Sequence, residues 1–150
     1  LMIWLFGPVD KVFASTAKRA LKFKTGDVVT ASLQHSSGLN SQITAILKTP
    51  HYQRVTIWGE SGWVELVDSS HPDTPGPSFM KIVMNDGTIK EENYEWTDTV
   101  SANIHNFIDS IQGQSKYLFT DVEKFQNISV LEAIYKSSLS KKNEKVESFN

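Results

Sequence analysis

Apolar and polar residues alternate with a period of two along much of the chain before residue 95, a pattern typical of half-buried β-strands. Val29, Ala31 and Leu33 alternate with small polar residues, and Ser36-Ser37-Gly38 then predicts a turn into a partner strand over 39–47. The same pattern predicts further strands at Val9–Ala17, from Arg54 through Ile57, Trp63–Val67, Met80–Met84 and Thr88–Tyr94, with a short one around Val146.

The connections between these strands carry turn residues. Asn85-Asp86-Gly87 is a strong hairpin signal, and Trp58–Trp63 predicts a tight connection because two glycines there can take φ > 0. Asp68–Ser78 holds three prolines and a glycine, which predicts the longest irregular loop. Lys18–Lys24 either continues the first strand or forms a basic connection.

The pattern near the C-terminus has the period of a helix instead. Its apolar residues share one helical face and end at Gly113: Val100, Ile104, Phe107, Ile108 and Ile111. Thr120-Asp121-Val122-Glu123 predicts a capping box, which begins a helix that runs to about Leu139 with Val130, Leu131 and Ile134 inward. At the other terminus, Leu1–Phe6 reads as the last turns of a helix closed by Gly7-Pro8.

Strands followed by helices predict an α+β fold, a predominantly antiparallel open sheet with helices packed on one face. The other face needs either water or a partner. Thr30, Ser32, Gln42 and Thr44 suit water, whereas Ile46 and the tryptophans favour a partner. We therefore expect a homodimer through this face. Most of the four tryptophans are otherwise expected to fill the core: Trp4, Trp58, Trp63 and Trp96.

Composition narrows the classes of function. The chain has 150 residues, a formal net charge of −2 and no cysteine. It therefore has no disulfide and no thiolate site, and its charge gives no reason to expect nucleic acid or an acidic membrane surface as a partner. These features are compatible with the cytoplasm. Because the chain begins with Leu1 inside a helix, we interpret it as one domain of a larger protein.

No complete catalytic site can be assembled from these residues. A dinucleotide site needs a glycine-rich strand-to-helix turn, and the close pair Gly59 and Gly62 lies between two predicted strands. A Gly-x-Ser-x-Gly elbow is absent too, so a self-contained hydrolase has little support. The four histidines show no metal-ligand spacing. Of these, only His51 is retained as a candidate, because it caps a loop together with Tyr52; a structural role is favoured even there.

Five segments, in this order, resemble the C-terminal domain of Gfo/Idh/MocA-type oxidoreductases, the relatives of glucose–fructose oxidoreductase and inositol dehydrogenase. They are Trp4–Gly7, the hairpin that follows Gly26-Asp27, Arg54–Leu66, Ile104–Gly113 and Val130–Ser138. The resemblance implies that 1–150 is a C-terminal substrate-binding and oligomerisation domain. In that family an N-terminal Rossmann domain binds NAD or NADP, and the catalytic Lys, Asp and His all precede the position of Leu1 here.

The resemblance therefore implies no catalytic residue and no bound cofactor within this chain, which we expect to be inactive alone. The full-length protein would use NAD or NADP on a sugar, polyol or related alcohol. Because the loop before the Arg54 strand often reaches the substrate in relatives, His51 and Tyr52 become candidates for hydrogen bonds to a substrate hydroxyl. A non-enzymatic ligand-binding or dimerisation module that uses the same sheet is the alternative.

Overall fold

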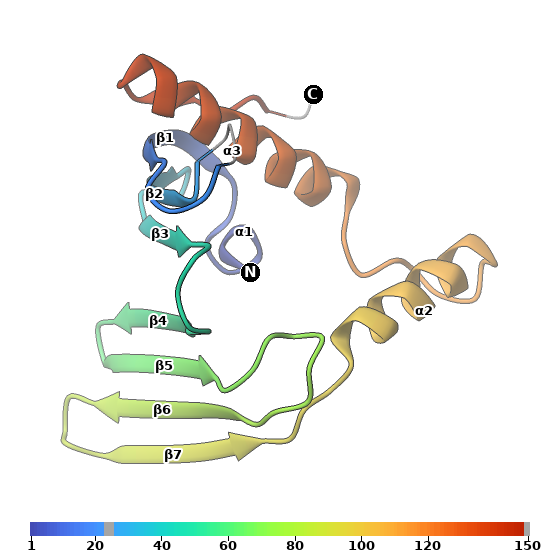
Figure 1. The fold of residues 1–150 in the computed structure, drawn as a ribbon. Coiled ribbons are helices and arrows are strands. Elements are labelled where there is room, and N and C mark those ends of the chain that lie inside the picture. Colours follow the sequence, from blue (N-terminus) through green and yellow to red (C-terminus); the bar gives the residue numbers. More distant parts are fainter. Residues whose placement is uncertain (23–25, 149–150) are drawn as a thin grey trace. The chain divides into compact units, whose positions relative to one another are not determined.

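The computed structural model describes residues 1–22 and 26–148 (Figure 1). The strands form two antiparallel sheets, ordered β3-β2-β1-β8 and β4-β5-β6-β7. In chain order the elements are α1 (Met2–Phe6), β1 (Val9–Ala17), β2 (Val28–His35), β3 (Asn40–Ile46), β4 (Gln53–Gly59), β5 (Gly62–Asp68), β6 (Ser78–Met84), β7 (Ile89–Tyr94), α2 (Thr99–Ile111), α3 (Asp121–Ser140) and β8 (Glu144–Lys145). The predicted α+β class is confirmed, and the expected open sheet is present as two four-stranded sheets. The chain divides into two compact units. The first consists of 1–48 together with 119–150, and the second consists of 49–118.

The first unit holds the hydrophobic core, which lies between α3 and one face of the β1–β2 ladder. Side chains two residues apart on a strand point to the same side of the sheet, so Val12 and Ala14 face α3 together. The residues buried there are Val9, Val12, Ala14, Ala31, Leu33, Val130, Ala133 and Val146. The opposite face of this sheet exposes Thr30, Ser32, Gln42 and Thr44, as predicted.

Helix α3 presents small polar side chains to the sheet as well as apolar ones. Its capping box at Thr120 is present as predicted, and Val130 is buried. Leu131, however, is 56% exposed, so the prediction that it faces inward is wrong. The helix is turned so that Gln126 and Ser137 face β1, where they bond to backbone groups that apolar side chains would leave unpaired.

These two polar side chains complete the edge of β1. Strand β8 forms a short ladder with β1, at Lys11 and Val12. On one side of that short ladder, the Val9 N–H donates to Gln126 Oε1 at 3.1 Å; on the other, the Ala14 N–H donates to Ser137 Oγ at 2.8 Å. Helix side chains thus close a strand edge that would otherwise expose unpaired amides.

Two further buried polar groups order the first unit. The Asp27 carboxylate accepts the N–H groups of Arg19, Ala20 and Leu21, so residues 18–21 form a connection rather than more strand. The rest of the predicted basic segment, at 23–24, lies outside the described residues. His35 is buried, with Nδ1 2.9 Å from the Gly7 carbonyl oxygen and Nε2 2.8 Å from Ser41 Oγ, which agrees with a structural role.

The second unit is a single-layer sheet followed by α2. Its β4–β5 hairpin places Trp58 directly opposite Trp63. None of its described residues is fully buried. The expectation that most tryptophans fill the core is wrong, since Trp58 is 76% and Trp4 73% exposed, while Trp63 and Trp96 are half-buried.

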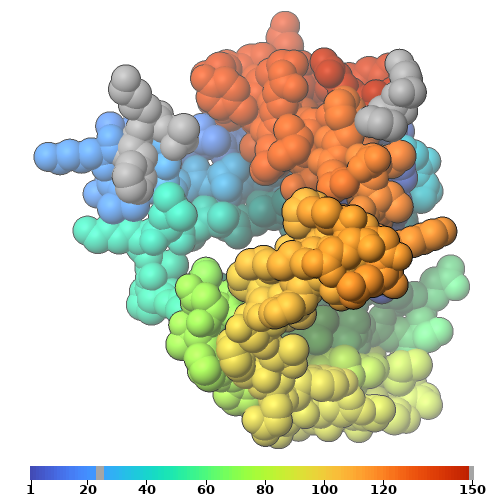
Figure 2. Space-filling model, turned by 90° about the vertical axis from the view of Figure 1, so that its right-hand side faces the viewer, coloured from blue at the N-terminus to red at the C-terminus, as the bar shows by residue number. Residues whose placement is uncertain are grey.

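Helix α2 forms at the predicted residues, but its apolar face is exposed. Every member of the predicted stripe lies at the surface: Val100, Ile104, Phe107, Ile108 and Ile111. In Figure 2 the atoms of α2, drawn in gold, are in full view. Asp98 caps the helix by accepting the N–H of Ser101 at 2.8 Å. The periodicity therefore predicted the position of α2 correctly. Of the described helices, α3 is the one that packs its face against a sheet as expected.

Candidate functional site

The register of the second sheet brings three connections to one end. Asp68 pairs with Gln53 on one side and with Ser78 on the other, and Ser78 pairs with Tyr94. The segment before β4, the β5–β6 loop and the β7–α2 connection therefore lie at the same end of this sheet (Figure 1). Loops at one end of a sheet are a common place for a binding site.

The β5–β6 loop, residues 69–77, is held by its own hydrogen bonds. The Ser69 N–H and hydroxyl both donate to the Pro77 carbonyl oxygen. The Ser70 hydroxyl donates to the Thr74 carbonyl oxygen at 2.7 Å. Gly76 lies so close to Ser70 that a Cβ there would be 2.3 Å from the Ser70 hydroxyl oxygen. Together with its prolines, these contacts preform the loop.

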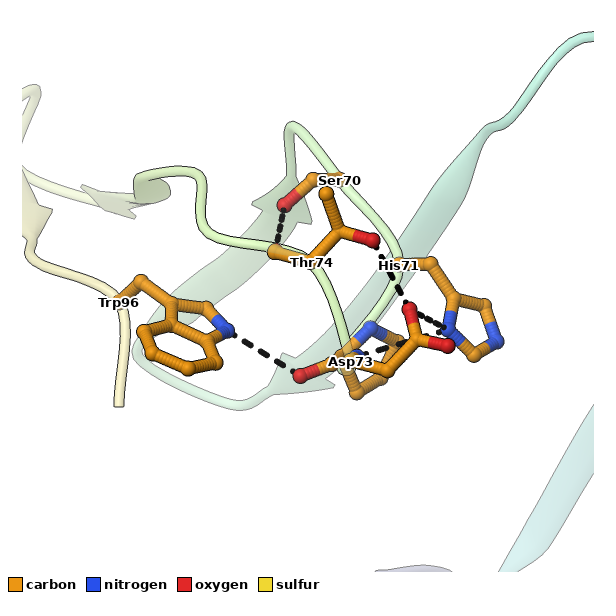
Figure 3. Close-up of polar contacts among 6 residues, drawn as sticks. Ser70, His71, Asp73, Thr74 and Trp96 are labelled. Carbon is orange, nitrogen blue, oxygen red and sulfur yellow. Dashed lines mark hydrogen bonds and ion pairs between the residues drawn. The ribbon is translucent and has the colours of Figure 1, made fainter. Parts of the chain in front are cut away.

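Two contacts fix the outer part of this loop (Figure 3). The Trp96 indole N–H donates to the Pro72 carbonyl oxygen at 3.1 Å and so ties the loop to the β7–α2 connection. His71 Nδ1 lies 2.7 Å from Asp73 Oδ1, and the bond from His71, the largest cause, holds the pKa of Asp73 below its ordinary value. This pairing orients the His71 ring at the surface of the loop.

A shallow pocket of about 270 Å³ lies between the β5–β6 loop and the β7–α2 connection. Its described lining combines carboxylates, hydroxyls and aromatic rings, and contains neither lysine nor arginine. The lining residues are Asp68, Ser70, His71, Pro72, Gly76, Ser78, Glu95, Trp96, Thr97 and Thr99. Such a lining can bond to a hydroxylated ligand and pack against one face of it.

The two residues singled out in the sequence lie just before β4. The His51 ring is exposed and meets the pocket-lining His71 edge to face, with 6.3 Å between ring centroids. Tyr52 is 67% exposed, and the Arg54 guanidinium lies 5.9 Å from its ring centroid. His51 is therefore next to the pocket, whereas Tyr52 does not line it.

Sequence reasoning did not find the groups that build the pocket. Asp68 received no functional role from the sequence; in the structure its Oδ1 accepts the Ser78 hydroxyl across the β5–β6 ladder at 2.6 Å. The sequence pointed to no role for Glu95, and it suggested for Trp96 only a place in the core or at a partner surface. The available signal was weak: an acidic–aromatic pair in the short connection between a strand and a helix.

The described residues do not suit a dinucleotide or a metal ion. Among them, β7 is the strand that leads directly into a helix, and its connection Glu95–Asp98 has no glycine and two carboxylates. Such a turn repels a pyrophosphate rather than cradling it. Within residues 1–22 and 26–148, no three His, Asp or Glu side chains converge on a possible metal position. In that same part of the chain, every helix is too short or too polar to cross a membrane.

Comparison with known proteins identifies the fold. A protein from Desulfitobacterium hafniense assigned as an NADPH-dependent oxidoreductase superposes with a TM-score of 0.79 at 16% identity, over 96% of this chain and 44% of its own. The WlbA dehydrogenase of Bordetella pertussis, in complex with NADH and UDP-GlcNAcA, gives 0.70 at 22% identity, over 99% and 42%. An oxidoreductase from Agrobacterium radiobacter, in complex with NAD⁺, L-tartaric acid and magnesium, gives 0.72 at 16%, over 96% and 45%.

At these identities the likeness establishes the fold alone, and the chain spans less than half of each of these three proteins. No curated protein sequence matches the chain. A family profile described as "Oxidoreductase family, C-terminal alpha/beta domain" matches residues 1–147. This match covers nearly the whole chain and agrees with the resemblance seen in the sequence. The chain therefore belongs to the Gfo/Idh/MocA family, as its C-terminal α/β domain.

Proposed function

We propose that this chain is the substrate-side domain of an NAD(P)-dependent oxidoreductase that acts on a sugar, a polyol or a related alcohol. The observation that carries the proposal is the family match over residues 1–147. Of the structurally similar oxidoreductases, one is in complex with NADH and UDP-GlcNAcA, and another with NAD⁺ and L-tartaric acid. Both of these ligands carry hydroxyl groups, which supports the oxidation of an alcohol. Because the described residues do not suit a pyrophosphate, the nicotinamide cofactor binds elsewhere in the full-length protein, and the chain is inactive alone.

In this function, His51 and Tyr52 donate or accept hydrogen bonds at substrate hydroxyl groups. Both side chains are exposed before β4, and the His51 ring lies beside a wall of the pocket. A neutral imidazole has one donor and one acceptor nitrogen, and a phenol can do either, so both match a hydroxyl. Their role is to bind and orient the substrate rather than to transfer a proton.

The test compares the chain with the full-length protein. Calorimetry should show no binding of NAD⁺ or NADP⁺ to the 150-residue chain, and the chain should oxidise no polyol. In the full-length enzyme, His51→Ala should raise KM about tenfold with a smaller change in kcat, as expected for the loss of a hydrogen bond to a bound substrate. His105→Ala, which changes an exposed histidine on α2, is the matched control. Turnover by the chain alone would contradict the proposal.

We also propose that the domain dimerises through the β4–β7 sheet. One face of this sheet, called here the tryptophan face, carries Arg54, Thr56, Trp58, Trp63, Glu65, Val67, Phe79, Lys81, Val83, Ile89, Glu91 and Asn93. Its charges are balanced, with ion pairs between Arg54 and Glu65 at 3.4 Å and between Lys81 and Glu91 at 2.7 Å. A neutral surface with exposed aromatic rings suits a second copy of itself in a two-fold arrangement.

A further inference from the structure

We propose that the pocket between the β5–β6 loop and the β7–α2 connection binds a single hydroxylated ring that carries a protonated amine, such as an amino sugar or an aminocyclitol. This inference rests on the proposed function and deepens it by naming the substrate class. It stands on the volume, the charge and the aromatic wall of the pocket, each of which restricts the ligand differently.

The volume restricts the size of the ligand. Pockets for drug-sized molecules span about 300–1,000 Å³, and this one, at about 270 Å³, lies just below that range. It has room for one six-membered ring with its substituents. A nucleotide attached to that ring would have to lie outside the pocket.

The charge of the lining restricts the sign of the ligand. Asp68 and Glu95 line the pocket, and no lysine or arginine in the described part of the chain does. The register places Arg54 and Lys81 on the tryptophan face, opposite to the face that carries Asp68, because successive residues of a strand alternate between faces. On the same face as Asp68, Lys90 is paired with Glu92. An anionic ligand would therefore meet two carboxylates without a compensating cation among the lining residues.

The carboxylates also have capacity for a donor-rich ligand. Asp68 Oδ1 accepts the Ser78 hydroxyl at 2.6 Å, which orients the carboxylate and leaves its second oxygen without a partner in the described part of the chain. Glu95 is exposed and makes no hydrogen bond to any described residue. An ammonium group has three donors and no acceptor, so it suits these oxygens better than a hydroxyl or an acetamide does.

The aromatic wall holds the ring itself. Trp96 is half-buried, and its indole N–H is occupied by the Pro72 carbonyl oxygen, so its orientation is set before any ligand arrives. An indole ring offers an apolar surface for the C–H groups of a sugar and attracts a nearby cation. Thr97 and Thr99 add hydroxyl groups along the same wall.

The experiment is an NMR titration of the 150-residue chain at about 50 mM salt, because low salt preserves the attraction between exposed charges. The probes are glucosamine, N-acetylglucosamine and glucuronate, and the Trp96 indole resonance is assigned with Trp96→Phe. Glucosamine should shift this resonance saturably and bind about tenfold more tightly than N-acetylglucosamine, as expected for a charge-assisted hydrogen bond. Glucuronate should not shift it. Equal binding of glucosamine and N-acetylglucosamine, or binding of glucuronate, would overturn the proposal.

Two variants localise the binding. Asp68→Asn and Glu95→Gln should each weaken glucosamine binding about fivefold to tenfold and leave N-acetylglucosamine within twofold, since each removes a charge and keeps the shape. Asp86→Asn, in the hairpin turn between β6 and β7, is the matched control and should change neither. The exposed Glu95 keeps the test valid if Asp68→Asn disturbs the β5–β6 ladder. Unchanged glucosamine binding in Glu95→Gln and in a folded Asp68→Asn would refute the assignment.

The titration separates this proposal from the proposed function because it uses no nicotinamide. If glucosamine binds and the full-length protein shows no NAD(P)-dependent turnover, the pocket assignment stands and the oxidoreductase function fails. If the full-length protein oxidises neutral polyols and the chain does not bind glucosamine, only the pocket assignment fails.

Discussion

Ser137 on α3 accepts a hydrogen bond from the backbone N–H of Ala14 on β1, with 2.8 Å between Oγ and N. The same hydroxyl donates to the Lys142 carbonyl oxygen at 2.6 Å, and the side chain is fully buried. One serine thus satisfies a strand edge and the backbone just beyond the C-terminal end of α3.

Ser137→Ala should therefore lower the free energy of unfolding by about 1–3 kcal/mol, because it leaves a buried N–H and a carbonyl oxygen without partners. Urea denaturation followed by circular dichroism measures the change. Ser138→Ala is the matched control, since among the described residues the Ser138 hydroxyl bonds only to the Tyr135 carbonyl oxygen one turn back in the same helix. If both substitutions lower the free energy of unfolding equally, the hydrogen bond to the edge of β1 contributes no more to stability than a bond within the helix.

The buried Asp27 carboxylate predicts a loss of stability in acid. Its bonds from the backbone N–H groups, that of Arg19 foremost, hold the pKa of Asp27 below its ordinary value of 3.8. Because the folded-state pKa is the lower one, the stabilisation is present above the unfolded-state pKa and is lost as the pH falls through the folded-state pKa. Asp27→Asn should lower the urea midpoint at neutral pH and lose less stability than the wild type between about pH 5 and pH 2.

Asp10→Asn serves as the control for this acid effect, because the exposed Asp10 carboxylate accepts one hydrogen bond within residues 1–22 and 26–148, from the Ser36 hydroxyl. It should change the urea midpoint less than Asp27→Asn does. Parallel pH profiles for wild type and Asp27→Asn would show that other carboxylates govern the acid transition.

The tryptophan face predicts an association that one substitution removes. The wild-type chain should sediment as a dimer at micromolar concentration, and Trp58→Lys should sediment as a monomer, because it buries an unpaired charge in a contact that is otherwise neutral. Gln42→Lys, which changes an exposed position of β3, should remain a dimer. A monomeric wild type in sedimentation velocity would count against the dimer.

The turn between β4 and β5 depends on Gly62. A Cβ at this position would lie 2.2 Å from the Val83 carbonyl oxygen, which belongs to the β5–β6 ladder and cannot move aside. Gly62→Ala should cost about 1–3 kcal/mol from this clash, as overpacking usually does. Gly87→Ala is the comparison: a Cβ there meets nothing within 4 Å, so only the strain of its φ of +88° remains. Thermal denaturation should rank Gly62→Ala as the less stable variant.

Much of the local structure was predictable because short segments of sequence encode it. The capping box at Thr120 depends on two residues three positions apart, and it is present where predicted. The helix stop at Gly7 and the hairpins at 36–38 and 85–87 likewise need only their own residues. Of the candidate site, His51 was retained from its loop position beside Tyr52; the resemblance suggested the substrate role of both residues, which remains a prediction.

The pocket and the packing of the helices depend instead on the register between strands and on contacts between residues far apart in the sequence. The pocket takes Asp68, Ser78 and Trp96 from three strand ends, and only the pairing of β5 with β6 and of β6 with β7 brings them together. Packing partners are equally non-local. The apolar stripe of α2 predicts a helix but not what covers it, and the buried face of α3 is chosen partly by the unpaired amides of β1.

The sequence by itself determined the elements, the α+β class and the family, because periodicity, caps, turns and the order of motifs are written along the chain. Only the tertiary structure decided which tryptophans are exposed, which face of α3 is buried and where the acidic pocket lies. The physical reason is that burial and site geometry depend on contacts between residues far apart in sequence, whose energies no local pattern contains.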